Sequence, residues 1–138
     1  MLKYRSEDGV AVDVRSEDVN AYIREHMGEE FSAKDFRTWA GTVAAAVALD
    51  EVGAVDGARS RQRAVAAVCR QAAELLGNTP AVCRANYIDP RVTDHFLDGR
   101  TISSLQTQVE RRLERGHRPD EMAVLALLRR GLEERAAA

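Results

Sequence analysis

The sequence predicts a mainly α-helical protein that begins with a short β-hairpin. Residues 1–15 alternate side chains on either side of a Ser-Glu-Asp-Gly turn, as the strands of a hairpin do. From residue 16 onward, apolar side chains recur at helical spacing between capping residues and glycines. The 138 residues suit one domain, which we divide into the hairpin at 1–15, helices at 16–100 and closing helices at 101–138.

The first two helices are predicted from their boundaries. Ser16 caps the first helix and Gly28 ends it. Ser32 opens the second, which covers 33–52 and is nearly free of polar side chains after Thr42, so we expect it to be the buried centre of the fold. Four apolar or aromatic residues of the first helix fall on one stripe of its surface: Val19, Tyr22, Ile23 and Met27.

The later helices follow in the same way. Residues 59–76 form an amphipathic helix with a basic flank, and Gly77 ends it. A threonine or aspartate cap followed by proline then starts two short helices, at Thr79-Pro80 and at Asp89-Pro90. Helices over 101–115 and 119–135 close the fold. The 59–76 helix should bury one side, made of Val65, Val68, Cys69, Ala72, Leu75 and Leu76.

Cysteine and histidine usage predicts no metal site. Cys69 and Cys83 lack a CxxC spacing, and the three histidines are scattered without ligand-like pairing. We expect both cysteines to be reduced core residues. No apolar run is long enough to span a bilayer and the N-terminus is too polar for a signal peptide, so we expect a cytoplasmic protein without a membrane partner.

The charge distribution is uneven. The net charge of −2 argues against a nucleic-acid partner, but residues 1–31 hold four basic and eight acidic side chains. Residues 59–91 hold six arginines against Glu74 and Asp89, a local net charge of +4 around Tyr87. A solvated helix face carries such charges as readily as a DNA-binding face does.

Three polar residues in the helical part have two interpretations each. Arg37, in the first turn of an apolar helix, either extends to solvent or reaches a partner for its guanidinium. Tyr87 either packs its ring and hydrogen-bonds its hydroxyl, the commoner use of a tyrosine, or does chemistry. Asn78 follows Gly77 and is either a helix cap or a ligand contact.

Two segments, "KDFRTWAGT" at 34–42 and "LGNTPAVCRANYIDPRV" at 76–92, together resemble the catalytic core of the type IB DNA topoisomerases, in the bacterial and poxviral branch. The first resembles the arginine motif of that family and the second its nucleophile segment. The helix "DVRSEDVNAYIRE" at 13–25 resembles the connection before the arginine motif. The resemblance covers the chain from Tyr4 to Phe96 and is weaker thereafter.

The resemblance implies relaxation of supercoiled double-stranded DNA through a reversible 3′-phosphotyrosyl intermediate, without ATP, metal or other cofactor. Tyr87 would be the nucleophile and Arg37 a bidentate donor to the phosphate, because charge develops on the phosphate oxygens. Asn78, nine positions before the tyrosine, would be the second donor. Backbone phosphate contacts would come from Lys34, Arg59, Arg61, Arg63 and Arg84.

The chain departs from the family pattern in one respect. The family also uses an earlier arginine and a lysine acting as general acid, both located before the stretch that corresponds to Tyr4. The only lysines here, Lys3 and Lys34, match neither. We therefore expect the C-terminal part of a topoisomerase catalytic domain, impaired alone, with the upstream half of the enzyme as a partner and the nucleoid as its location.

Two alternatives stay open. The chain could be a noncatalytic helical module that binds DNA or a protein partner. It could also be a fragment of a tyrosine recombinase, which uses the same arginine and tyrosine logic. That family has histidines at the positions of Lys34 and Asn78, which makes it the weaker alternative.

Overall fold

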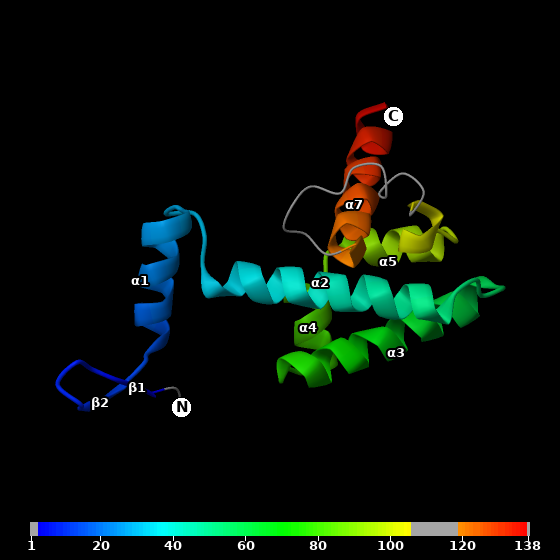
Figure 1. Ribbon diagram of the computed structural model, residues 1–138. Helices are drawn as coiled ribbons and strands as arrows, with labels where there is room; N and C mark the ends of the chain where they lie inside the picture. The colour runs from blue at the N-terminus through cyan, green and yellow to red at the C-terminus, as the bar shows by residue number, and fades with distance from the viewer. Residues whose placement is uncertain (1–2, 106–118, 138) are drawn as a thin grey trace. The chain divides into compact units, whose positions relative to one another are not determined.

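The computed structural model describes residues 3–105 and 119–137 (Figure 1). It is mainly helical with a two-stranded antiparallel hairpin at the N-terminus, which confirms the predicted fold class. The chain divides into two compact units, Met1–Arg37 and Thr38–Ala138, which we describe separately. The assignment of the whole chain to one domain stays a prediction.

The hairpin consists of β1 (Lys3–Arg5) and β2 (Ala11–Asp13), with Tyr4 opposite Val12. The predicted turn closes through a hydrogen bond from the Ser6 N–H to the Val10 carbonyl, 3.0 Å. Gly9 adopts a φ of 77°, which a residue without a Cβ tolerates without strain. The hairpin is therefore built by its turn residues, as the sequence predicted.

Helix α1 (Ser16–Met27) begins one residue earlier than expected. Its N-cap is Arg15, not Ser16, so that prediction was wrong. The Asp18 carboxylate, three residues further on, accepts the Arg15 N–H at 2.8 Å, which is the bond that the third residue of a helix makes back to the N-cap backbone. Gly28 ends the helix at a φ of 118°.

The apolar stripe of α1 is buried at one position only. Ile23 is buried, whereas Tyr22 is 63% and Met27 50% exposed. The Tyr22 ring stacks on His26 with ring centroids 4.1 Å apart. Within the first unit the hairpin and α1 therefore enclose little apolar surface.

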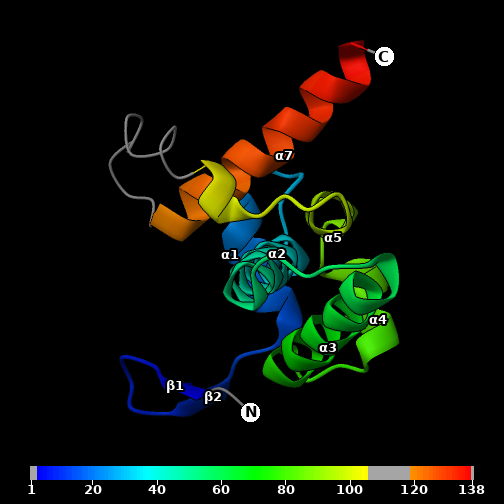
Figure 2. The same ribbon diagram turned by 90° about the vertical axis from the view of Figure 1, so that its right-hand side faces the viewer.

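Helix α2 (Ala33–Val52) has the bounds that the sequence predicted. Ser32 precedes it, and the Asp35 carboxylate accepts the Ser32 N–H at 2.8 Å. Within the second unit, α2 has α3 and α4 on one side and α5 and α7 on the other, as Figures 1 and 2 show. It contributes Val43, Ala45, Ala46 and Leu49 to the core, as expected for the central helix.

Helices α3 (Ala58–Leu76), α4 (Pro80–Asn86) and α5 (Pro90–Leu97) follow at the predicted positions. Gly77 ends α3 in the left-handed conformation. Thr79 accepts the Val82 N–H at 3.3 Å, and Asp89 accepts the Arg91 N–H at 2.9 Å, so both predicted caps are confirmed. Both cysteines are free and buried in the core.

One core prediction for α3 was wrong. Leu75 is 71% exposed, while the buried residues of α3 are Val65, Val68, Cys69, Ala72 and Ala73. Successive residues of an α-helix are about 100° apart around the axis, and that rotation places Leu75 beyond the edge of the buried stripe.

The C-terminal part begins with η1 (Ile102–Leu105), a 3₁₀ helix, and ends with α7 (Pro119–Ala137). Residues 102–105 are the described part of the helix predicted over 101–115, and the remainder lies outside the described residues. Helix α7 buries Ala123, Val124 and Leu127 in the core. Of the helices in the described ranges, none has the length and apolar character needed to cross a membrane.

Candidate functional site

Tyr87 lies immediately after the last residue of α4, between the core residues Cys83 and Ile88. Its N–H donates to the Cys83 carbonyl at 2.8 Å, so its backbone closes the last turn of the helix. The side chain is half-buried and packs against the hydrophobic core. A packed ring is compatible with either interpretation of this tyrosine, so burial alone does not choose between them.

A short face of α2 holds the backbone on both sides of Tyr87. The Thr38 hydroxyl donates to the Asn86 carbonyl at 3.3 Å, and the buried Thr42 hydroxyl accepts the Asp89 N–H at 3.1 Å. Between them, Gly41 lies against the Tyr87 carbonyl so closely that a Cβ would approach it within less than 3.0 Å. We call Thr38, Gly41 and Thr42 the α2 cradle.

The α2 cradle is the part of the site that was not predicted. Its three members lie at positions i, i+3 and i+4, which is one face of a helix. A glycine and a threonine in the most apolar helix of the chain were a signal of a close backbone approach, because glycine is otherwise unfavourable in a helix interior by about 1 kcal/mol.

Asp89 fixes the other end of the segment. Its carboxylate takes two hydrogen bonds from the Arg91 guanidinium, at 3.0 and 2.6 Å, besides capping α5. The same guanidinium donates to the Leu128 carbonyl of α7 at 3.4 Å. Its hydrogen bonds to the Asp89 carboxylate raise the pKa of Arg91. Arg91 is therefore committed to intramolecular contacts that connect α5 with α7.

Asn78 follows the left-handed Gly77 and completes the end of α3. Its N–H donates to the Ala73 carbonyl at 2.8 Å, and its side-chain amide donates to the Leu76 carbonyl at 3.3 Å. The cap interpretation is thus realised in the structure, and the phosphate contact stays a prediction. Asn78 and Tyr87 flank opposite ends of α4, a helix about 10 Å long.

The predicted phosphate-binding arginines differ in their surroundings. Arg59 and Arg63 are exposed on α3, and Arg84 is exposed in the last turn of α4. Arg84 also lines a cavity of about 290 Å³ together with Gln62, Val65 and Leu97. Burial raises the pKa of the neighbouring Cys69 thiol, and the Arg84 charge opposes that rise.

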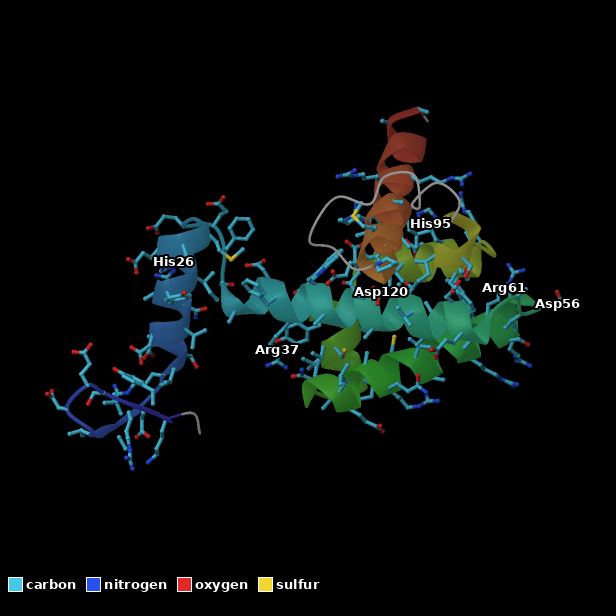
Figure 3. The ribbon with its side chains drawn as sticks, in the orientation of Figure 1. His26, Arg37, Asp56, Arg61, His95 and Asp120 are labelled. Atoms are coloured by element: carbon cyan, nitrogen blue, oxygen red, sulfur yellow. The ribbon has the colours of Figure 1, made fainter. Side chains whose placement is uncertain are left out.

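Arg61 has a different environment from the exposed arginines. Its Nε donates to the Val55 carbonyl at 2.9 Å and its Nη1 to the Leu97 carbonyl at 2.7 Å (Figure 3). These two bonds tie the loop before α3 to the end of α5. The predicted DNA contact of Arg61 has not been tested, but its guanidinium already has structural partners.

Arg37 and Lys34 belong to the first unit, where both are exposed in the first turn of α2. Arg37, labelled in Figure 3, is the residue directly before Thr38 of the α2 cradle in the sequence. Tyr87, Asn78, Arg84 and the arginines of α3 belong to the second unit. The structure thus brings together the nucleophile segment and the α2 cradle. Arg37 and Lys34 belong to the other unit.

Comparison with known families extends the motif evidence. The family model for the eukaryotic DNA topoisomerase I catalytic core matches residues 3–114, which is most of the chain. A comparison with curated proteins returned no match. The matched range includes both motif segments, Tyr87 and the α2 cradle, and it confirms the predicted topoisomerase family, while the branch stays a prediction. The chain therefore belongs to the family of the eukaryotic DNA topoisomerase I catalytic core, whose substrate is DNA.

Proposed function

We propose that this chain carries the nucleophile of a type IB topoisomerase, of the bacterial and poxviral branch, which relaxes supercoiled double-stranded DNA. The observation that carries the proposal is the attachment of the backbone on both sides of Tyr87 to the Thr38 and Thr42 hydroxyls of the α2 cradle. A tyrosine on an independent loop would not be held in this way. The family match over residues 3–114 supports DNA as the substrate.

The proposed reaction has two reversible steps. The Tyr87 hydroxyl oxygen attacks a backbone phosphorus, and the bond between that phosphorus and the 5′ oxygen breaks. The phenolic proton passes to solvent water, and the departing 5′ oxygen accepts a proton from a general acid. After the free end rotates, the 5′ hydroxyl attacks the phosphotyrosine, releases Tyr87 and reseals the strand.

Two side chains are proposed to stabilise the charge that develops on the phosphate oxygens. The Arg37 guanidinium would donate two parallel hydrogen bonds, a geometry that matches a phosphate. Asn78 would donate one amide hydrogen bond and would do so independently of pH, because an amide does not titrate. Loss of such a donor commonly costs on the order of a hundredfold or more in rate.

The surrounding basic residues would bind the duplex backbone. Exposed Arg59, Arg63 and Arg84 are suited to phosphate contacts because nothing in the core has to be broken to reach DNA. Lys34 would add a contact from the start of α2. Arg61 would first have to release the Val55 and Leu97 carbonyls, so we assign it the smallest share of DNA binding.

The general acid is proposed to come from the upstream half of the enzyme. Only two lysines occur in the chain. Lys3 lies in β1 and pairs with Asp13 at 3.3 Å, and Lys34 occupies the "KDFR" motif. Neither matches the general acid that the family uses, so full activity should require the upstream half.

A covalent-trap assay tests the proposal. A nicked duplex whose short 5′ fragment diffuses away after cleavage would accumulate a protein–DNA adduct, visible on a denaturing gel. The chain would be assayed alone and with the upstream half, as wild type, Tyr87→Phe and the control Tyr22→Phe. We expect an adduct that requires the upstream half, disappears in Tyr87→Phe and persists in Tyr22→Phe.

The result that would overturn the proposal is an adduct in the Tyr87→Phe variant, or no adduct from a folded, reassembled wild type. In the second case, salt-dependent DNA binding would separate a noncatalytic DNA-binding module from a protein-binding one, because phosphate contacts weaken steeply with salt. The local cap contact of Asn78 is the observation that favours this noncatalytic alternative.

A further inference from the structure

We infer that the α2 cradle is a positioning device for the nucleophile, and that Thr42 sets the register of Tyr87 by holding the N–H of Asp89. This inference rests on the proposed function, since it assigns Tyr87 a reacting hydroxyl. It adds three positioning residues, Thr38, Gly41 and Thr42, none of which needs to touch DNA.

The segment after α4 depends on tertiary contacts for its position. Helix α4 has only seven residues, which is too short to be stable by itself. The carbonyl of its last residue, Asn86, has no partner within the helix, because the last carbonyls of any helix lack one. That carbonyl and the Asp89 N–H both find partners on α2, in the Thr38 and Thr42 hydroxyls.

Gly41 sets how closely the segment approaches α2. The space that a Cβ would occupy is filled by the Tyr87 carbonyl, and the Leu76 Cδ1 would lie only 3.1 Å away. The Tyr87 backbone therefore contacts the α2 backbone directly at Gly41, with no intervening side chain. A backbone-on-backbone contact is stiffer than one made through rotatable side chains, so it suits a group that must be held in place.

Asp89 completes the arrangement from the far side. Its N–H is held by Thr42, and its carboxylate is held by Arg91, which also donates to the Leu128 carbonyl. The segment around Tyr87 is thus held by α2 through Asn86 and Asp89. Asp89 is held in addition by Arg91 of α5, which also contacts α7. A displacement of either end would carry the tyrosine hydroxyl with it.

Thr42→Val is the decisive substitution because valine matches threonine in shape but cannot accept a hydrogen bond. It removes the acceptor that the buried Thr42 hydroxyl gives to the N–H of the part-buried Asp89. Thr42→Ser restores the acceptor and removes only a methyl group. Thr93→Val is the matched control, since Thr93 is also buried and its hydroxyl donates to the Pro90 carbonyl at 2.8 Å, outside the α2 cradle.

The experiment measures the rate of adduct formation on the nicked duplex, with the upstream half present, and the DNA dissociation constant of each variant. Misplacing a reacting group by about 1 Å commonly costs on the order of a hundredfold in rate, so Thr42→Val should slow adduct formation by about ten- to a hundredfold. Thr42→Ser should recover most of the rate. DNA affinity should stay the same in all three variants.

Two results would overturn the inference: a wild-type rate in Thr42→Val, or an equal slowing in Thr93→Val, which would indicate a general loss of stability. Hydrogen exchange of the Asp89 amide gives a readout that does not depend on catalysis. It should become faster in Thr42→Val and stay slow in Thr42→Ser and Thr93→Val.

The exchange measurement also separates this inference from the proposed function. If wild type forms no adduct, the proposed function fails, and the Tyr87 ring resonances still report on positioning. They should shift in Thr42→Val while those of Tyr4 and Tyr22 stay in place. Unchanged exchange at Asp89 together with an unchanged Tyr87 ring signal would refute the positioning role.

Discussion

The substitution Gly41→Ala tests the close contact between α2 and the Tyr87 backbone. The added methyl carbon would lie less than 3.0 Å from the Tyr87 carbonyl oxygen, whereas ordinary contacts begin at 3.4 Å. The segment after α4 must therefore move by more than the difference, about 0.4 Å. Catalytic groups must be held within about 0.5 Å, so even this smallest shift uses most of that tolerance for the nucleophile.

Two effects of opposite sign determine the stability of Gly41→Ala. Alanine is favoured over glycine in a helix by about 1 kcal/mol. Overpacking typically costs about 1–3 kcal/mol, and the upper part of that range applies here because the neighbour is backbone and cannot rotate away. We expect a net loss of about 1–2 kcal/mol in the free energy of unfolding.

The assay is urea unfolding followed by the fluorescence of Trp39, the only tryptophan in the sequence. Trp39 is half-buried on α2, and its Nε1 donates to Glu121 of α7 at 3.4 Å, so its signal reports on the same core. Ala40→Gly, at an exposed position of α2, measures helix propensity without the clash. If Gly41→Ala instead raises the free energy of unfolding by the amount that Ala40→Gly lowers it, the close contact is refuted.

Other predictions concern the arginines and the C-terminal half. Arg61→Ala should lower the free energy of unfolding by about 2 kcal/mol because two charged hydrogen bonds to carbonyls are lost. Arg63→Ala, on the exposed face, should change it by less than about 0.5 kcal/mol. Equal effects of the two substitutions in urea unfolding would contradict this difference. Arg63→Ala should instead reduce the salt dependence of DNA binding, by a slope of about 1 in titrations at several salt concentrations. Burial acts to raise the pKa of Asp50, but hydrogen bonds from Ser103 and Thr101 outweigh it, so the pKa is lowered. The stability from Asp50 is then fully present above its unfolded pKa of about 3.9 and is lost as the pH falls through the lower folded value, so Asp50→Asn should flatten the acid side of a stability–pH curve. An unchanged curve would rule out that linkage.

Local hydrogen bonds explain which elements the sequence predicted well. The Thr79 and Asp89 caps, the Gly28 and Gly77 stops and the Ser6–Val10 turn are each formed by residues at most five positions apart. Such contacts leave a pattern in a short stretch of sequence. The Arg15 cap of α1 was missed by only one residue, and the hydrogen bond from its N–H to the Asp18 carboxylate is also local.

Contacts between distant segments explain what the sequence could not predict. The α2 cradle joins residues 38–42 to 86–89, and no pattern within either segment alone identifies its partner. Arg61 and Arg91 were counted in the basic stretch of residues 59–91, yet their guanidinium groups bond to carbonyls and a carboxylate that packing brings near them. The charge pattern gives the number of arginines in a region. It does not reveal which of them form hydrogen bonds or ion pairs within the protein.

Mapping the trapped adduct onto the chain shows whether Tyr87 is the nucleophile. The three tyrosines fall in three different tryptic peptides, and Tyr87 is the only tyrosine in the peptide of residues 85–91. After nuclease digestion of the bound DNA, mass spectrometry should find the remaining nucleotide, linked through its 3′ phosphate, on that peptide. A linked nucleotide on the peptide that contains Tyr4 or Tyr22, with residues 85–91 unmodified, would show that Tyr87 is not the nucleophile.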